Sequence, residues 1–331
     1  MSQAKGPKVV VIGGGTGTFN VLSALKYYAR DVTAIVNMSD DGGSTGILRD
    51  ELGALPPGDV RQCLVALSES DQVMRDLFNY RFETGAFGGH SLGNLFLTAL
   101  EKTTGSFGGA VKTAGDVLKI TGRVIPVTLT SIKLKLTRPD GSTVTGQHAV
   151  ELSTFTSKRP NLSLTPKAKL NPEAKQAIED ADLVVIAPGN LYATLAPTLL
   201  VDGMSQALQD TKAKLVYITN LVTKPGQTDG FKAHDFASEI ERFIGAPALD
   251  YVIFNHQQPD KELLEKYAFA GEYAVEFEPR IMAHAHYEAI GENLVSDTIP
   301  HLKPAEKLIP RTLIRHDGDR LSRLIMRIYF T

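Results

Sequence analysis

The sequence predicts an α/β fold: a doubly wound, mostly parallel, Rossmann-like sheet with a helical insertion and a β-hairpin excursion. Three observations support this fold class. Short runs of aliphatic and β-branched residues alternate with segments of helical periodicity. Glycine-rich loops follow two of those runs. A long helical segment and a stretch with a period of two interrupt the alternation. We therefore expect a single domain over residues 1–331, with a mostly helical insertion at about 45–120 and a hairpin at about 124–150.

The first elements predict a βαβ unit. Val9–Ile12 is an unbroken β-branched run, typical of a parallel strand buried on both faces. Phe19–Tyr28 carries apolar residues at helical spacing, and Thr33–Met38 is a second apolar strand. Strand, loop, helix and strand within ~30 residues make up such a unit.

Capping and turn residues mark the two interruptions. Asp59, which follows two prolines, and Ser91 are each expected to cap a helix of the insertion. The Asp-Gly turn in Arg138–Gly141 lies between period-two segments and predicts the hairpin. Residues ~153–172 are expected to be a surface connection. Further strands are expected at Leu183–Ala187, Leu215–Thr219, Val252–Phe254 and Thr312–Arg315.

Composition narrows the class of protein. Lys and Arg number 35 and Asp and Glu 37, a formal charge of −2. This balance argues against a nucleic-acid partner, because binding the phosphate backbone needs a basic surface. Cys63 is the only cysteine, which excludes an intramolecular disulfide and a Cys-ligated zinc site. Met1–Lys8 is polar, and no stretch approaches the ~20 apolar residues of a membrane helix. We expect a cytoplasmic protein with no membrane insertion.

The loop after the first strand is the clearest candidate for ligand binding. Glycines between a strand and a helix let the backbone approach a phosphate, and the helix N-terminus adds free N–H groups. The spacing is not that of a P-loop, and Thr18 stands where a dinucleotide fingerprint has its last glycine. The alternative is a tight turn without a ligand, but four glycines in five residues exceed what a turn requires. The loop consists of Gly13, Gly14, Gly15, Thr16 and Gly17.

Three more loops carry polar residues at expected strand ends. Asp40–Gly46 contains two adjacent acids that could hold a ribose hydroxyl, orient a substrate or bind Mg²⁺; helix capping is the alternative. Pro188–Tyr192 repeats the strand–glycine–helix pattern, and Asn220–Asp229 leaves another strand. Because the carboxyl ends of parallel strands meet at one edge of a sheet, these loops are expected to converge on one crevice.

Isolated polar residues add candidates with open alternatives. His90 suits a general base or a phosphate contact, or a structural cap. Arg49, Arg61 and Arg315 could each neutralise a phosphate or form a surface ion pair.

Seven motifs occur in order along the chain: Ile12–Gly17, Asp40–Ser44, Leu55–Leu64, Gly89–Leu95, Pro188–Tyr192, Lys224–Gly230 and Arg315–Asp317. In combination, these motifs resemble the YvcK family of gluconeogenesis factors, within the superfamily of CofD, the 2-phospho-L-lactate transferase. The resemblance extends over about residues 8 to 325. Ile47 departs from it, standing where that family usually has Arg, and Asn190 stands where it usually has Ser.

The resemblance implies a nucleotide-sugar ligand similar to UDP-N-acetylglucosamine, and a role in cell-envelope precursor supply, cell shape and gluconeogenic growth. A homo-oligomer and a regulated protein partner would accompany that role. The expected ligand contacts are Gly13, Gly14, Gly15, Thr16, Gly17, Asp40, Gly43, Ser44, Arg49, Asp59, Arg61, Asn94, Gly189, Asn190, Tyr192, Asn220, Thr223, Asp229 and Arg315.

Two other activities are weighed. A phospholactyl or nucleotidyl transferase would use Asp40, Asp41 and His90 as catalytic residues. Asp40 and Asp41 would bind Mg²⁺, and Arg49 or Arg61 would stabilise the transition state. An NAD-dependent oxidoreductase is disfavoured because the fingerprint is incomplete.

Overall fold

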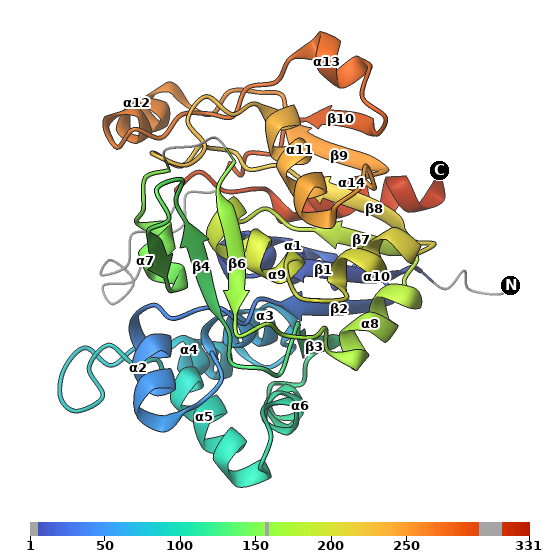
Figure 1. The fold of residues 1–331 in the computed structure, drawn as a ribbon. Coiled ribbons are helices and arrows are strands. Elements are labelled where there is room, and N and C mark those ends of the chain that lie inside the picture. The colour runs from blue at the N-terminus through green and yellow to red at the C-terminus, as the bar shows by residue number, and fades with distance from the viewer. Residues whose placement is uncertain (1–5, 156–158, 298–312) are drawn as a thin grey trace, which may run out of the picture.

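The computed structural model describes residues 6–155, 159–297 and 313–331, and a parallel sheet forms its centre (Figure 1). In these residues seven strands form the sheet in the order β10-β9-β8-β7-β1-β2-β3. All neighbouring strands are parallel. The strands are β1 (Lys8–Gly13), β2 (Asp31–Val36), β3 (Arg123–Pro126), β7 (Leu183–Ile186), β8 (Lys214–Ile218), β9 (Tyr251–Asn255) and β10 (Glu288–Glu292). The predicted fold class is confirmed.

The strand order reverses between β1 and β7. From β1 the chain proceeds to β2 and β3 on one side, and from β7 to β8, β9 and β10 on the other. In open α/β sheets, ligands bind outside the carboxyl ends of the strands at such a switch point. The two glycine-rich loops follow β1 and β7 and therefore lie there.

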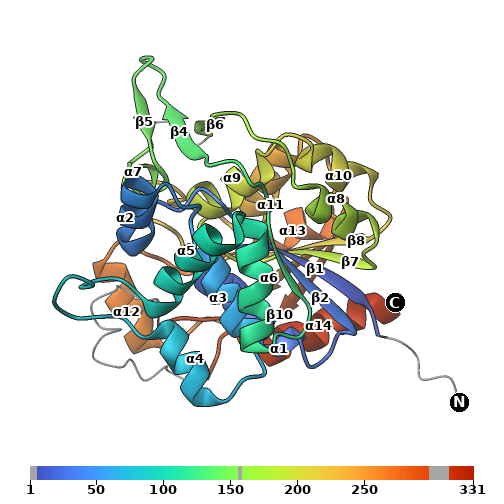
Figure 2. The same ribbon diagram turned by 90° about the horizontal axis from the view of Figure 1, so that it is seen from below.

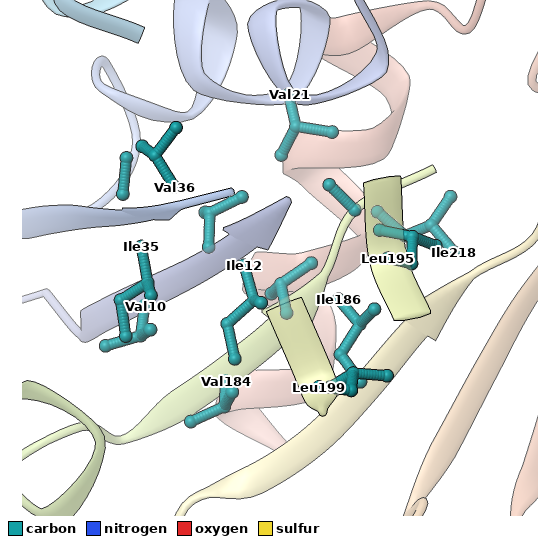
Figure 3. Close-up of a cluster of buried hydrophobic side chains, with 14 of the residues drawn as sticks. Val10, Ile12, Val21, Ile35, Val36, Val184, Ile186, Leu195, Leu199 and Ile218 are labelled. Atoms are coloured by element: carbon teal, nitrogen blue, oxygen red, sulfur yellow. The ribbon is translucent and has the colours of Figure 1, made fainter. Parts of the chain in front are cut away.

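Helices cover both faces of the sheet, as Figures 1 and 2 together show. Figure 3 shows Val21 of α1 and Leu195 and Leu199 near strand residues such as Ile12 and Ile186. Each of these side chains is at most 2% exposed. The β-branched runs form the central strands because those strands are buried on both faces. The covering elements are α1 (Gly15–Leu25) and α14 (Gly318–Phe330) on one face, and α8 (Pro172–Glu179), η1 (Leu191–Leu195), α9 (Ala196–Leu199), α10 (Met204–Asp210) and α11 (Ala233–Ile244) on the other.

The segment between β2 and β3 is helical. Ser91 caps α5 by accepting from the Asn94 N–H. The expected cap by Asp59 is wrong: Pro57 occupies the N-cap position of α3, and the Asp59 carboxylate accepts from the distant Gly15 N–H instead. The helices are α2 (Gly43–Leu52), α3 (Gly58–Leu67), α4 (Gln72–Asn79), α5 (Leu92–Thr104) and α6 (Phe107–Leu118).

The hairpin is shorter than predicted and gains a third strand. Residues 123–126 form β3 of the main sheet, because they pair with β2. The hairpin consists of β4 (Lys133–Thr137) and β5 (Thr143–Thr145), and α7 (Gln147–Glu151) replaces its expected end. β6 (Asn161–Thr165) pairs with β4, where we expected only a surface connection. Figure 2 shows β4 and β5 projecting from the body of the protein.

The C-terminal part differs from expectation in one place. The expected strand Thr312–Arg315 begins outside the described residues, and residues 313–315 form no strand. Among the described residues, no helix has the length and apolar character needed to cross a membrane. The remaining helices are α12 (Lys261–Phe269) and α13 (Pro279–Ala283).

Candidate functional site

A cleft opens at the switch point of the sheet. Its volume is about 390 Å³, within the range typical of ligand sites. Figure 1 shows α2, α7 and α12 at the edge toward which the parallel strands run. The predicted ligand contacts that line the cleft are Gly14, Gly15, Thr16, Gly17, Arg61, Gly189, Asn190 and Asn220. The lining residues that were not predicted are Gln62, Arg81, Glu151, Pro188, Thr194, Leu221, Val222, Ile314 and His316.

Packing explains part of the first glycine loop. A Cβ at Gly17 would lie 1.9 Å from the Pro188 carbonyl oxygen, and one at Gly14 would lie 2.3 Å from Asp59 Oδ2. Gly15 has a φ of +69°, and a Cβ there would meet no described heavy atom within 4 Å. Glycine is therefore required at position 17 by the close contact with the loop after β7, and at position 15 by the left-handed backbone conformation. Helix α1 begins without a side-chain cap from the described residues.

The loop after β7 closes against the loop after β8. Asn190 Oδ1 accepts from the N–H groups of Tyr192 at 3.2 Å and Ala193 at 3.0 Å, which caps η1. Asn220 Nδ2 donates to the Gly189 carbonyl oxygen at 2.8 Å. Both asparagines line the cleft. The loops that follow β1, β7 and β8 thus meet in one place.

A chain of hydrogen bonds links four predicted residues to the cleft. Arg61 Nε donates to Asn94 Oδ1 at 3.0 Å, and Asn94 Nδ2 donates to Ser44 Oγ at 3.2 Å. Ser44 Oγ lies 3.0 Å from His90 Nδ1. Asn79 also accepts from Arg61. Of these residues Arg61 lines the cleft, so the others hold its guanidinium in place.

Asp59 is buried against the first glycine loop, and the half-buried carboxyl of Asp40 affects its pKa. Asp59 Oδ1 accepts the Gly15 N–H at 3.0 Å. Burial, and then the charge of Asp40, raise the pKa of Asp59 to about 7. Burial also raises the pKa of Asp40, whose Oδ1 accepts the Gly42 N–H at 3.0 Å. The charge of Asp40 thus disfavours the ionisation of Asp59, and the charge of Asp41 adds to the raised pKa of Asp40.

Asp41 and Arg49 hold the hairpin segment to the main body. The Asp41 oxygens accept the N–H groups of Gln147 at 3.0 Å and His148 at 2.8 Å, at the start of α7. Arg49 donates to the carbonyl oxygens of Asp40 at 2.7 Å and Ile132 at 2.8 Å. These contacts engage Asp41 away from Asp40, which differs from the adjacent metal-binding pair that the sequence suggested.

Two further predicted contacts lie apart from the cleft lining. Tyr192 is buried, and its hydroxyl donates to Glu239 Oε2 at 3.2 Å. Asp229 Oδ2 accepts the Gly226 N–H at 2.7 Å, inside its own loop.

The other predicted contacts stabilise loop backbones. Thr223 Oγ1 accepts the Tyr273 N–H at 3.1 Å. The Gly13 and Arg315 carbonyl oxygens accept from the N–H groups of Asn37 at 3.1 Å and Ser296 at 2.8 Å. Gly43 begins α2 with a φ of +44°.

His316 is a cleft residue that the sequence reasoning did not select. Its Nε2 lies 3.1 Å from the Thr219 carbonyl oxygen. Burial lowers the pKa of His316 to about 4, so the ring is neutral at pH 7 and donates this bond from Nε2. Its position beside Arg315, in the last of the quoted motifs, was the available signal.

Comparison with known proteins gives consistent matches over almost the whole chain. The family model described as 2-phospho-L-lactate transferase CofD matches residues 9–295. A gluconeogenesis factor of Listeria innocua is 40% identical over 325 residues, which are 97% of this chain and 95% of that protein. A gluconeogenesis factor of Bacillus subtilis is 35% identical over 322 residues, 97% of each chain.

The fold also matches a solved structure. A member of the UPF0052 family from Bacillus halodurans superimposes with a TM-score of 0.88 at 36% identity. The match covers 96% of this chain and 99% of that chain.

Proposed function

The chain belongs to the CofD family, in which it groups with the gluconeogenesis factors, and on this basis we propose that it is a cytoplasmic nucleotide-sugar-binding protein. The ligand is similar to UDP-N-acetylglucosamine. Binding regulates a protein partner, and through it cell-envelope precursor supply, cell shape and growth on gluconeogenic carbon sources.

One observation carries the ligand class: both glycine loops line a single cleft at the β1–β7 switch point. Gly15, Thr16 and Gly17, at the N-terminus of α1, line this cleft, and a helix N-terminus favours an anion. Arg61 adds a fixed positive charge, oriented by Asn94. A diphosphate carries the matching charge, so we assign the phosphates to the loop Gly14–Gly17 and to Arg61.

Thermal unfolding with candidate ligands tests this function. UDP-N-acetylglucosamine, GTP and NAD are each added with Mg²⁺ and with EDTA. A ligand at 100 times its Kd stabilises the fold by about 2.7 kcal/mol. The expected result is stabilisation by the UDP-sugar that persists in EDTA. Stabilisation by NAD alone would refute the proposal.

A Mg²⁺-dependent transferase of the CofD type is the second candidate, favoured by the carboxyl pair Asp40 and Asp59. Mg²⁺ is commonly held by one or two carboxylates together with substrate phosphates. No group of three or more His, Cys, Asp or Glu residues suited to a metal occurs in the described residues, so a pair with phosphate is the arrangement that fits.

In that reaction Asp40 and Asp59 would hold the ion, which would neutralise charge on the transferring phosphoryl group. Asp59 would also keep the Gly15 N–H oriented, and Arg61 would stabilise the developing charge. Turnover of the nucleotide that requires Mg²⁺ and disappears in Asp40→Asn would support this candidate. The candidate would be refuted if the wild type and Asp40→Asn bind the UDP-sugar equally well and neither protein turns it over in the presence of Mg²⁺.

A further inference from the structure

A second chamber adjoins the cleft. Its volume is about 200 Å³. Glu151, Asn190, Asn220 and Val222 line both spaces and therefore form the boundary between them. A ligand whose phosphates lie on the glycine loops can extend past this boundary into the chamber.

The chamber has an apolar side and a side of hydrogen-bonding groups. Leu191 and Phe236 are buried, at 2% and 1% exposure, and supply apolar surface together with Val222. The loop after β8 and the start of the segment after α12 supply the polar side, which consists of Thr223, Lys224, Gln227, Thr228 and Glu272.

Two amide side chains of the wall have orientations set by their donors. Gln227 Nε2 donates to the carbonyl oxygens of Val150 at 2.9 Å, and of Glu151 and Ser153 at 3.0 Å. Asn220 Nδ2 donates to the Gly189 carbonyl oxygen at 2.8 Å. A flipped amide would place oxygen against these carbonyl oxygens, so Gln227 Oε1 and Asn220 Oδ1 are fixed as acceptors.

Neither amide oxygen has a hydrogen-bond partner among the described residues, and both are closed to solvent. A buried acceptor left unpaired costs about 1–3 kcal/mol. A bound group that reaches these oxygens with N–H or O–H donors removes this cost.

The charges of the chamber also select against an anion. Glu151 and Glu272 are carboxylates, and Lys224 Nζ lies 3.7 Å from Glu151 Oε1. Burial raises the pKa of Glu272, and Lys224 opposes that rise. One ammonium between two carboxylates favours a neutral group with several donors over a phosphate.

We propose that this chamber binds the sugar end of the nucleotide sugar, with Glu272 and Asn220 accepting from its hydroxyl or acylamino groups. The assignment rests on the proposed function. A hexose carries several O–H donors and C–H faces that pack on apolar residues, whereas uracil carries a single N–H donor. The sugar therefore matches a wall of acceptors better than the base does.

Calorimetric titration of UDP and UDP-N-acetylglucosamine into the wild-type protein and Glu272→Ala tests the proposal. We expect the wild type to bind the UDP-sugar at least tenfold more tightly than UDP. Glu272→Ala should weaken UDP-sugar binding about tenfold, equivalent to about 1.4 kcal/mol, and leave UDP within twofold. Glu265→Ala, on the exposed side of α12, is the matched control and should behave as the wild type. If Glu272→Ala does not fold, Glu272→Gln, which preserves the shape of the side chain, replaces it as the test. We expect Glu272→Gln to weaken UDP-sugar binding at least threefold.

The outcomes separate the two proposals. Equal affinity of the wild type for UDP and the UDP-sugar, or an unchanged ratio in both Glu272 variants, overturns the sugar assignment and leaves nucleotide binding standing. Equal weakening of both ligands places the base in the chamber and also overturns it. Failure of the wild type to bind either ligand overturns the proposed function itself.

Discussion

Replacement of Asp59 by asparagine removes a buried carboxyl whose ionisation the fold opposes. Burial and the charge of Asp40 raise the pKa of Asp59 to about 7, whereas an unfolded chain gives aspartate a pKa of about 3.9. Between these values the folded protein holds a proton that the unfolded chain has released. Stability of the wild type therefore falls as pH rises through this window, and levels off above about 7.

The magnitude follows from the width of that window. Each pH unit inside it costs about 1.4 kcal/mol, so the wild type should lose about 2–3 kcal/mol of unfolding free energy between pH 5 and pH 8 through this group. Asparagine does not titrate and keeps a side-chain oxygen for the Gly15 N–H. Asp59→Asn should therefore gain about 2–3 kcal/mol relative to the wild type over the same pH interval.

Urea unfolding at pH 5, 6, 7 and 8 in EDTA measures this difference. Asp116→Asn, on the exposed side of α6, is the control, and its stability should remain parallel to that of the wild type. If the Asp59→Asn and wild-type curves also stay parallel, Asp59 is ionised throughout, and burial and the charge of Asp40 do not raise its pKa.

Three further predictions concern the contacts around the cleft. Gly17→Ala should lower the unfolding free energy, measured by thermal melts, by about 1–3 kcal/mol and should weaken UDP-sugar binding, because the Cβ would lie 1.9 Å from the Pro188 carbonyl oxygen. The control is Gly108→Ala in α6, where the new Cβ has no described heavy atom within 4 Å, and it should not destabilise the protein. Asn94→Ala should weaken nucleotide binding about tenfold, near 1.4 kcal/mol, since Arg61 Nε loses its acceptor; unchanged affinity in a calorimetric titration would show that Asn94 does not orient Arg61. Asp41→Ala should speed hydrogen exchange of the Gln147 and His148 amides, whose acceptor it removes, and equal exchange rates in both proteins would contradict that anchoring role.

The sequence predicted the central strands because their burial on both faces appears directly as continuous aliphatic runs. β1, β7 and β8 are examples. The edge strands carry a weaker signal. β10 reads Glu-Ala-Ile-Gly-Glu and is half-exposed, and β3 spans four residues and ends in proline. Both segments are strands because they pair with a neighbouring strand, β9 or β2, and no local sequence pattern encodes that pairing.

The sequence predicted the strand-end loops that form the candidate site, but not which contacts the individual side chains make there. Strand ends and glycines indicated the loops after β1, β7 and β8, which do converge, but the Asp40–Gly46 loop, also expected there, does not line the cleft. The contacts that define roles join residues far apart in sequence, such as Asp59 with Gly15 and Asp41 with His148. Asp40 and Asp41 are adjacent in the chain, yet their carboxylates have different partners: Asp40 accepts from the Gly42 N–H within its own loop, and Asp41 accepts from the N–H groups at the start of α7. Spacing alone cannot distinguish such partners.

Calorimetric titration of UDP-N-acetylglucosamine into the wild-type protein in EDTA, with Gly17→Ala in parallel, decides whether the cleft binds a nucleotide sugar. We expect saturable binding of one ligand per chain, with binding lost or strongly weakened in the variant. Absence of binding to the wild type, or equal binding to a folded Gly17→Ala protein, would contradict the assignment of a nucleotide sugar to the cleft between the two glycine loops.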